Sequence, residues 1–337
     1  MEPVTAIAIG GRTVGDEAPT YVIAEIGSNH DGALSEAIRL IEASAQAGAD
    51  CVKFQSYRAD TLVVPTHPGH ATLQRLSVPP SWYPDLKAAA DRCGVHFASA
   101  PFDLEAVQEL VAAGVPMLKI ASGDLTYTDL LEAAAATGLP LVVSTGAAYL
   151  GEVDEALRTM RAAGATQIAL MHCASAYPAT FESANVRAVA TLRSAFGVPV
   201  GFSDHTPGHA AALAAVALGA RLIEKHITFE RTQPGPDHSY ALTVEEFADL
   251  VRNIRALESS LGSGAKEPVD LEFGERVGAR RGVYAARRLE PGHVLEADDL
   301  VCVRPLDGVP AARRKELVGR RLIRGLEALT PIQWEDL

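Results

Sequence analysis

Residues 201–238, GFSDHTPGHAAALAAVALGARLIEKHITFERTQPGPDH, decide the fold of this chain. We expect a strand over 200–204, a helix over 209–218 and a second strand over 221–226. The helical part is nearly all Ala, Val and Leu, with little polar surface, and Ala and Leu are good helix formers. A strand, a helix and a second strand are typical of a parallel sheet, in which the carboxyl ends of neighbouring strands share one edge. The stretch therefore predicts His205 and His226 at the same edge.

Two histidines at one edge have two interpretations. Neutral imidazole is a common ligand, so His205 and His226 are candidate ligands of a divalent metal with open coordination positions. The alternative is a pair of polar rim residues that bind no metal. Their spacing matches no compact signature such as HExxH. The stretch by itself leaves both interpretations open.

The same alternation of apolar strand and Ala-rich helix extends along most of the chain. Expected strands cover 21–27, 51–55, 96–100, 117–122, 141–145, 168–173, 200–204 and 221–226. Glycines such as Gly94 and Gly197 stand between a helix and the next strand, where a left-handed residue ends the helix. Eight such units fit an α/β fold of the (β/α)8 TIM-barrel type, whose usual size is about 250 residues. An open doubly wound sheet is the alternative, but neither GxGxxG after the first strand nor a Walker loop is present.

The rest of the chain predicts the domain organisation. Residues 6–14, AIAIGGRTV, are expected to form a hairpin, so that 1–261 make a barrel domain with an N-terminal hairpin. Residues 262–280 are polar and rich in glycine, which is typical of a linker. Residues 281–337 contain short β-like runs broken by turn residues, and we expect a small, mostly β domain there.

Composition excludes several function classes. The 337 residues carry a net charge of −12, which argues against a nucleic-acid partner because phosphate contacts need a basic face. The four cysteines are far apart and form no CxxC pair, so we expect reduced thiols in a cytoplasmic protein. The N-terminus does not have the pattern of a signal peptide, and no apolar run is long enough to cross a membrane.

In a TIM barrel the carboxyl ends of all strands form the active-site face. Lys53 and Lys119 stand there within the apolar strands VKFQ and LKIAS. With the hydroxyls of Ser122, Ser144 and Ser203 they suit a phosphate and a carboxylate. The alternatives are lysines paired with carboxylates as scaffolding, and a lysine that forms a Schiff base, as in barrel aldolases.

Glu25 also lies within an apolar strand of the expected barrel. One interpretation is a buried carboxylate that caps a loop or pairs with a lysine. The other is a general acid/base whose pKa is set by burial and by nearby cations.

The motifs of the whole chain resemble the sialic acid synthase family, which includes N-acetylneuraminate synthases and spore-coat polysaccharide synthases. The matching stretches are IAEIGSNHDG, AGADCVKFQ, LKIASGD, VVSTG, MHCASAYP, GFSDHT, ALGARLIEKHIT and GPDHSYAL. YAARRLEPGHVL and VRP, near the end, resemble the family's antifreeze-like (SAF) domain. The resemblance implies condensation of phosphoenolpyruvate with an N-acyl hexosamine to a nine-carbon 2-keto-3-deoxy sugar acid and phosphate.

The same resemblance implies roles for individual residues. His205 and His226 would hold a divalent metal, Mn²⁺ or Mg²⁺, and Glu25 would be the acid/base. Tyr177 and Asp237 would lie near the amino-sugar acceptor, and Arg304 would reach the acceptor from the partner subunit of a domain-swapped homodimer. The implied phosphoenolpyruvate contacts are Lys53, Gln55, Lys119, Ser122, Ser144 and Ser203.

This chain departs from the family pattern at three places. Ala100 replaces a hydroxyl residue after the third strand, and Ser175 stands where an Asn is common. The segment that carries Arg304 reads Arg-Pro-Leu-Asp-Gly instead of Arg-Pro-Gly. A Schiff-base aldolase and a non-catalytic sugar-binding barrel are the alternative functions at this stage.

Overall fold

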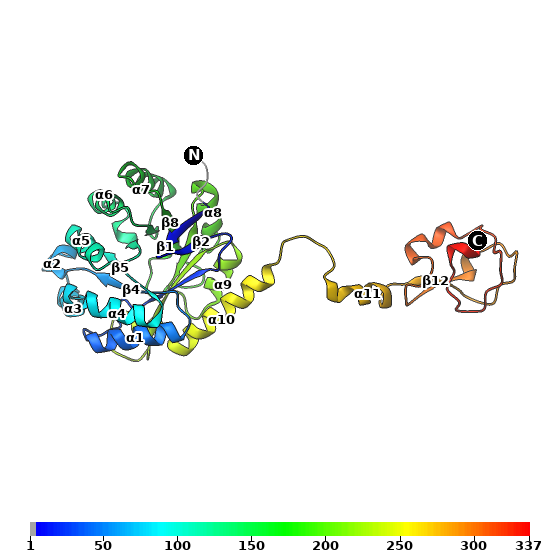
Figure 1. Ribbon diagram of the computed structural model, residues 1–337, viewed down its shortest axis with the longest axis horizontal. Coiled ribbons are helices and arrows are strands. Elements are labelled where there is room, and N and C mark those ends of the chain that lie inside the picture. The colour runs from blue at the N-terminus through cyan, green and yellow to red at the C-terminus, as the bar shows by residue number, and fades with distance from the viewer. Residues whose placement is uncertain (1–4) are drawn as a thin grey trace. The chain divides into compact units, whose positions relative to one another are not determined.

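The structure is a computed structural model, and it describes residues 5–337. The chain divides after Gly262 into two compact units, Met1–Gly262 and Ser263–Leu337 (Figure 1). No helix in the described part of the chain is long and apolar enough to cross a membrane.

Eight parallel strands of the first unit close into a barrel. Each strand pairs with the next one along the chain, and β10 pairs with both β9 and β3. The predicted TIM barrel is confirmed, and the alternative of an open sheet is wrong. The strands are β3 (Tyr21–Glu25), β4 (Cys51–Ser56), β5 (His96–Pro101), β6 (Leu118–Ile120), β7 (Leu141–Ser144), β8 (Ile168–Cys173), β9 (Val200–Asp204) and β10 (Leu222–Thr228).

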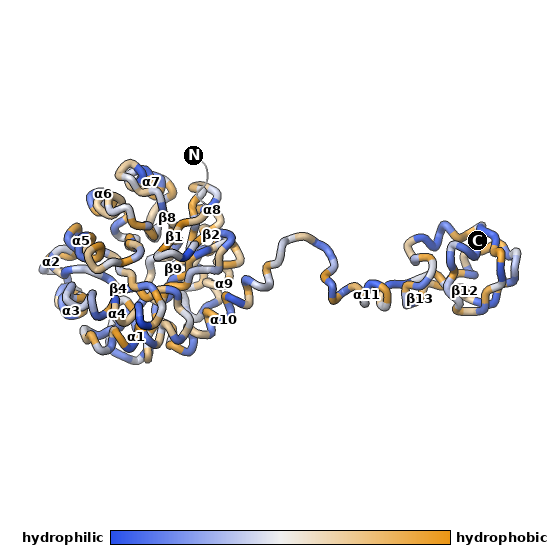
Figure 2. The backbone as a smooth tube through the Cα atoms, in the orientation of Figure 1, coloured by the Kyte–Doolittle hydropathy of each residue, from blue (hydrophilic) through white to orange (hydrophobic). Residues whose placement is uncertain are grey.

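Helices cover the outside of the barrel (Figure 1). Their apolar sides pack against the outward side chains of the strands, and in Figure 2 the barrel strands are largely orange while the helices alternate in colour. The helix predicted over 209–218 is α9, Ala210–Ala217. The other helices are α1 (Leu34–Gln46), α2 (Ala59–Leu62), α3 (His70–Leu76), α4 (Tyr83–Cys93), α5 (Leu104–Ala112), α6 (Thr128–Ala136), α7 (Leu150–Ala162), α8 (Ala188–Phe196) and α10 (Val244–Leu261).

A short hairpin closes the amino end of the barrel. β1 (Ala6–Ile9) and β2 (Arg12–Gly15) are antiparallel, as the sequence predicts. Ile7, Ile9 and Val14 from this hairpin share one buried cluster with interior residues from the first positions of the barrel strands. The barrel interior is therefore sealed at this end by apolar side chains.

Alternation along each strand gives the interior two chemically different zones. Successive side chains of a strand point to opposite faces, so every second residue faces the interior. In β10 these residues are Leu222, Glu224 and His226, and in β4 they include Cys51 and Lys53. In these two strands the interior residue nearer the amino end is apolar, and the next interior residue along the strand is charged. A layer of polar side chains therefore lies above a layer of apolar side chains at the amino end of the barrel.

The second unit is built around a small antiparallel sheet. β12 (Gly282–Ala285) pairs with β13 (Leu300–Val303), and isolated bridges extend the β structure. A core of aliphatic side chains, among them Val283, Leu295 and Leu322, packs around the sheet. Within the predicted linker 262–280, the chain forms a short helix that the sequence did not predict, α11 (Phe273–Gly278).

Candidate active site

A cavity of about 380 Å³ opens at the carboxyl ends of the barrel strands. Twelve of the thirteen predicted site residues line it. They are Glu25, Lys53, Gln55, Lys119, Ser122, Ser144, Ser175, Tyr177, Ser203, His205, His226 and Asp237. The thirteenth, Arg304, directly follows β13 in the second unit, where it is exposed. Its role at an active site stays a prediction.

Four charged side chains form the floor of the cavity. Lys53 Nζ lies 2.8 Å from Glu25 Oε2 and 3.7 Å from Glu224 Oε1. Lys119 Nζ lies 3.7 Å from the other oxygen of Glu224, Oε2. All four are nearly inaccessible to solvent, so their charges act in a medium that screens them weakly. Glu224 therefore lies between the two ammonium groups as their shared counterion.

The pKa values of the two carboxyl groups in this floor, Glu25 and Glu224, are shifted in opposite directions. Burial raises the pKa of Glu25 to about 7; the attraction of Lys53 opposes the shift, and the negative charge of Glu224 adds to it. Burial also opposes ionisation of Glu224, but Lys119 and Lys53 outweigh it and lower its pKa to about 2. Two carboxyl groups with separated pKa values are typical of an acid/base site. Glu25 is thus poised to exchange a proton near neutral pH, while Glu224 stays ionised.

The lysines also differ from each other. The pKa of Lys53 is raised, because Glu224 and Glu25 outweigh the effect of burial. Burial lowers the pKa of Lys119, with Glu224 opposing the shift. Lys119 Nζ donates to Ser144 Oγ at 2.5 Å, and Ser203 Oγ donates to Glu224 Oε1 at 3.0 Å. The hydroxyls predicted for an anion site thus lie directly beside the charged cluster.

Two histidines lie next to this cluster. The ring centroids of His205 and His226 are 5.4 Å apart, close enough for both imidazoles to reach one ion. Burial lowers the pKa of both rings, in His226 to about 3, so both are neutral at physiological pH and able to ligate a metal. Nδ1 of His226 is buried and has no hydrogen-bond partner in the described part of the chain.

The carboxylate of Asp237 lies beside His226. Asp237 Oδ2 lies 3.9 Å from Nδ1 of His226 and accepts hydrogen bonds from the backbone and side chain of Ser28. Its other oxygen accepts from the hydroxyl of Tyr240 at 2.6 Å. Burial opposes ionisation of Asp237, but the hydrogen bonds from Tyr240 and Ser28 stabilise the carboxylate and its pKa is lowered. Tyr177 packs against His205 with ring centroids 4.3 Å apart and is 57% exposed, so it forms the outer wall of the cavity.

A backbone segment after β7 approaches the hydroxyl groups closely. The N–H of Gly146 donates to Ser122 Oγ at 3.1 Å. A Cβ at Gly146 would lie only 2.1 Å from Ser175 Oγ and 2.6 Å from Cys173 Sγ, so a side chain here would push these two groups aside. Ser175 lines this part of the cavity with a hydroxyl, and Ala100 adds only a methyl group.

Two functional side chains of the cavity, Glu224 and Tyr240, were not among the predicted site residues. Glu224 stands two positions before His226 in the sequence and therefore on the same face of the strand. Two lysines in apolar strands also require a counterion, and this requirement could have identified Glu224. Tyr240, whose ring centroid lies 4.9 Å from that of His226, carried no such signal, because its position depends on the loop after β10.

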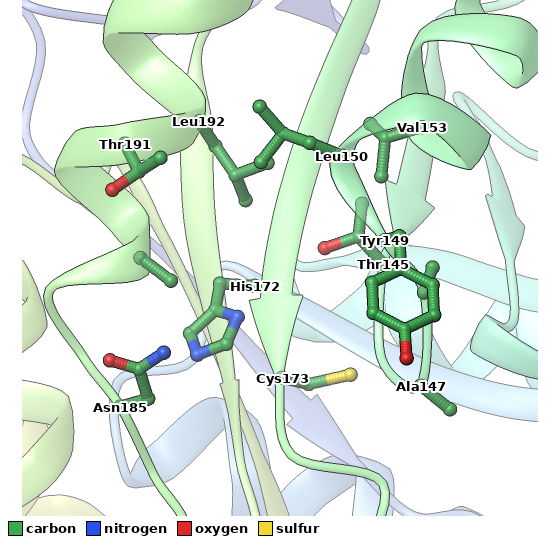
Figure 3. Close-up of a pocket in the computed structure, with 12 residues that line it drawn as sticks. Thr145, Ala147, Tyr149, Leu150, Val153, His172, Cys173, Asn185, Thr191 and Leu192 are labelled. Atoms are coloured by element: carbon green, nitrogen blue, oxygen red, sulfur yellow. The ribbon is translucent and has the colours of Figure 1, made fainter.

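A larger cavity, of about 560 Å³, lies between α7 and α8 (Figure 3). His172, Asn185 and Thr191 supply much of its polar lining, together with aliphatic residues such as Leu192. Nε2 of His172 is already hydrogen-bonded to the carbonyl of Ala184. Neither lysine nor arginine lines this cavity, so the chemistry of an anion site belongs to the smaller one.

Comparison with known proteins agrees with this geometry. The chain matches the NeuB family over residues 40–266 and the SAF domain over residues 280–337. It is 38% identical to the N,N'-diacetyllegionaminic acid synthase of Legionella pneumophila, over 97% of each chain.

Solved structures give the same result. An N-acetylneuraminic acid synthetase from Leptospira borgpetersenii superposes with a TM-score of 0.77 and 34% identity, over 81% of this chain and 96% of that one. The Bacillus subtilis spore coat polysaccharide biosynthesis protein spsE gives a TM-score of 0.71 and 36% identity, over 98% of each chain. With its barrel, its charged cavity and its C-terminal SAF domain, the chain belongs to the NeuB family of sialic-acid-synthase-type enzymes.

Proposed function

We propose that the chain condenses phosphoenolpyruvate with an N-acyl hexosamine of the N-acetylmannosamine type. The products are a nine-carbon 2-keto-3-deoxy sugar acid and phosphate. One observation carries the proposal: two buried lysines and two neutral imidazoles face the same cavity of about 380 Å³. This arrangement joins a site for an anionic donor to a site for a carbonyl acceptor.

The charged floor suits the donor. With Glu25 protonated, Lys53, Lys119 and Glu224 together carry a net charge of +1, which favours an anion in this weakly screened position. A bound phosphate would also favour the charged form of Lys119, whose pKa burial lowers. Ser122, Ser144 and Ser203 add hydroxyl donors, and Gln55 orients Glu25 by donating to its Oε1 at 2.8 Å.

The two imidazoles suit a divalent ion, Mn²⁺ or Mg²⁺. Burial lowers the pKa of both rings, and the buried Nδ1 of His226 has no hydrogen-bond partner in the described part of the chain, which supports a ligand at this position. No group of three or more His, Cys, Asp or Glu side chains that could hold a metal is found among residues 5–337, so the protein would supply two ligands and leave positions open. When bound, such an ion polarises the aldehyde oxygen of the acceptor.

The reaction forms one carbon–carbon bond and one carbon–oxygen bond, the latter from water, and breaks the carbon–oxygen bond to phosphate. The methylene carbon of phosphoenolpyruvate attacks the aldehyde carbon, and a water adds to the middle carbon of the donor. Protonated Glu25, with a pKa near 7, can give its proton to the aldehyde oxygen and, as the carboxylate, take the proton of that water. The tetrahedral adduct then releases phosphate, whose charge Lys53 and Lys119 stabilise. Asp237 and Tyr177, at the outer part of the cavity, would contact the acceptor sugar.

Phosphate release tests this proposal. With phosphoenolpyruvate, N-acetylmannosamine and Mn²⁺, the chain should release phosphate and form the sugar acid, as detected by mass spectrometry. His226→Ala should abolish both products, whereas His67→Ala, at an exposed loop position, should retain them. An H226A variant that keeps the full rate would contradict the site assignment. A panel of related hexosamines identifies the acceptor.

A Schiff-base aldolase remains the second candidate, and one observation limits it to Lys119. Lys53 is held protonated by Glu224 and Glu25 and is therefore a poor nucleophile, whereas burial lowers the pKa of Lys119. Borohydride trapping of pyruvate on Lys119 would favour this mechanism. The absence of a trapped adduct from an enzyme that releases phosphate would exclude it.

We further propose a domain-swapped homodimer in which Arg304 contacts the acceptor bound by the partner subunit. The VRP motif that contains Arg304 and the match to the SAF domain support this assignment. The four free cysteines support a cytoplasmic location. Sedimentation should show a dimer, and Arg304→Ala should raise the KM of the acceptor while leaving that of phosphoenolpyruvate unchanged. A fully active monomer would contradict the swap.

A further inference from the structure

A buried ion pair joins β9 and β10 just before the two histidines. Lys225 Nζ donates to Asp204 Oδ2 at 2.8 Å, and the two residues are direct partners in the parallel register. Their side chains are 1% and 0% exposed. Lys225 stands between Glu224 and His226, which face the cavity, so it points to the other side of the strand. The pair thus lies between the barrel wall and the helices, outside the cavity.

The same ion pair also fixes the backbone on both sides of His205. Asp204 Oδ1 accepts hydrogen bonds from the backbone N–H and the hydroxyl of Thr206, both at 2.8 Å. Lys225 Nζ donates to the carbonyl oxygen of Thr206 as well. Both neighbours of His205 are therefore tied to Lys225, which itself directly precedes His226. One ammonium group fixes the backbone at both histidines.

The histidine rings have few hydrogen bonds of their own. Nδ1 of His205 is hydrogen-bonded to the carbonyl of Ala174 at 3.1 Å. Nδ1 of His226 has no such partner in the part of the chain that the structure describes. The position of the His226 ring consequently depends on its strand and on packing against Tyr240. A small shift between β9 and β10 would change the distance between the two imidazoles.

We propose that Lys225 and Asp204 are positioning residues that hold His205 and His226 at the separation needed to bind one divalent ion. This inference rests on the proposed function, in which the two imidazoles are the metal ligands. A buried ion pair contributes little net stability, because desolvation offsets the attraction, and well-packed apolar residues of similar volume often replace it without loss. The role of this pair is therefore geometric: it fixes the register of two strand ends.

Three variants separate geometry from stability. Lys225→Met and Asp204→Asn each leave one buried polar partner unmatched, so both should lower the Tm. The double variant removes both charges and should recover most of that loss. The double variant still lacks the hydrogen bonds between Lys225 and the end of β9. Its dissociation constant for Mn²⁺, measured by electron paramagnetic resonance of the free ion, should therefore remain about tenfold or more higher than that of wild type.

Ile223→Ala is the matched control. Ile223 is fully buried, faces the helices from the same strand and side as Lys225, and carries no charge or hydrogen-bonding group. It should lower the Tm while leaving Mn²⁺ affinity unchanged. The inference is overturned if the double variant binds Mn²⁺ as tightly as wild type, or if Ile223→Ala weakens binding as much as the double variant does. A wild-type protein that binds no Mn²⁺ would instead overturn the proposed metal site itself.

Discussion

Replacing Glu25 with Gln measures how unfavourable the ionised carboxylate is at its position. Burial, aided by Glu224, raises the pKa of Glu25 from 4.5 to about 7 even though Lys53 lies 2.8 Å away. At about 1.4 kcal/mol for each pH unit, this difference corresponds to about 3 kcal/mol. Gln has the shape of the protonated acid and never ionises, so Glu25→Gln should escape this cost.

The size of this stabilisation by Glu25→Gln depends on pH. The folded protein binds the Glu25 proton more tightly than the unfolded chain does, so this group's contribution to stability is fully present below pH 4.5. It is lost as the pH rises to about 7 and stays lost above that value. Relative to wild type, Glu25→Gln should therefore gain little at pH 4.5 and about 3 kcal/mol at pH 8.

Scanning calorimetry of the barrel transition at several pH values tests this reasoning. For a domain of this size about 1 kcal/mol corresponds to about 2–4 °C, so the Tm of the variant should exceed that of wild type by roughly 10 °C at pH 8. Phosphate release should be lost at the same time. The control Glu42→Gln, at an exposed position of α1, should show no such trend. A difference that is flat between pH 5 and 8, or a less stable variant at pH 8, would refute the argument.

Three further substitutions test the barrel interior. Gly201→Ala should destabilise the barrel by several kcal/mol in calorimetry, since the new Cβ would lie 2.6 Å from the carbonyl oxygen of Leu222, a backbone atom that cannot move aside. Gly146→Ala should raise the KM of phosphoenolpyruvate with little change in Tm, because its Cβ would displace the side chain of Ser175. Lys119→Met should lower kcat/KM for phosphoenolpyruvate by about a hundredfold, in line with the loss of one charged hydrogen bond to the donor, and raising its concentration should restore part of the rate.

Strand periodicity made the fold and most of the cavity predictable. Once eight strands alternate with helices, the side-chain period of two decides which residues face the interior, and Lys53 and Lys119 follow directly. The bounds of the elements were less certain: the strand expected over 117–122 covers only Leu118–Ile120, because the chain turns into a short 3-10 helix at Ser122.

Charge partners and loops were harder to predict. The sequence indicated that each lysine needed a counterion, but only the barrel's closure through β10 shows that one residue, Glu224, serves both. Tyr240 reaches the site through the loop after β10, whose path follows from hydrogen bonds such as that between Ser28 and Asp237. The hydrogen bond between Ser28 and Asp237 joins residues about two hundred positions apart, and no local sequence pattern predicts it.

The hairpin at the amino end of the barrel has a consequence for the order of events during turnover. Because Ile7, Ile9 and Val14 close that end of the barrel, substrates would reach the cavity through its opening at the carboxyl ends of the strands, one after another. The ammonium groups lie at the bottom, whereas Tyr177 borders the entrance. An amino sugar that arrived first would stand in the path of the smaller donor. We expect compulsory loading with phosphoenolpyruvate ahead of the sugar, and departure of phosphate as the last step of the cycle.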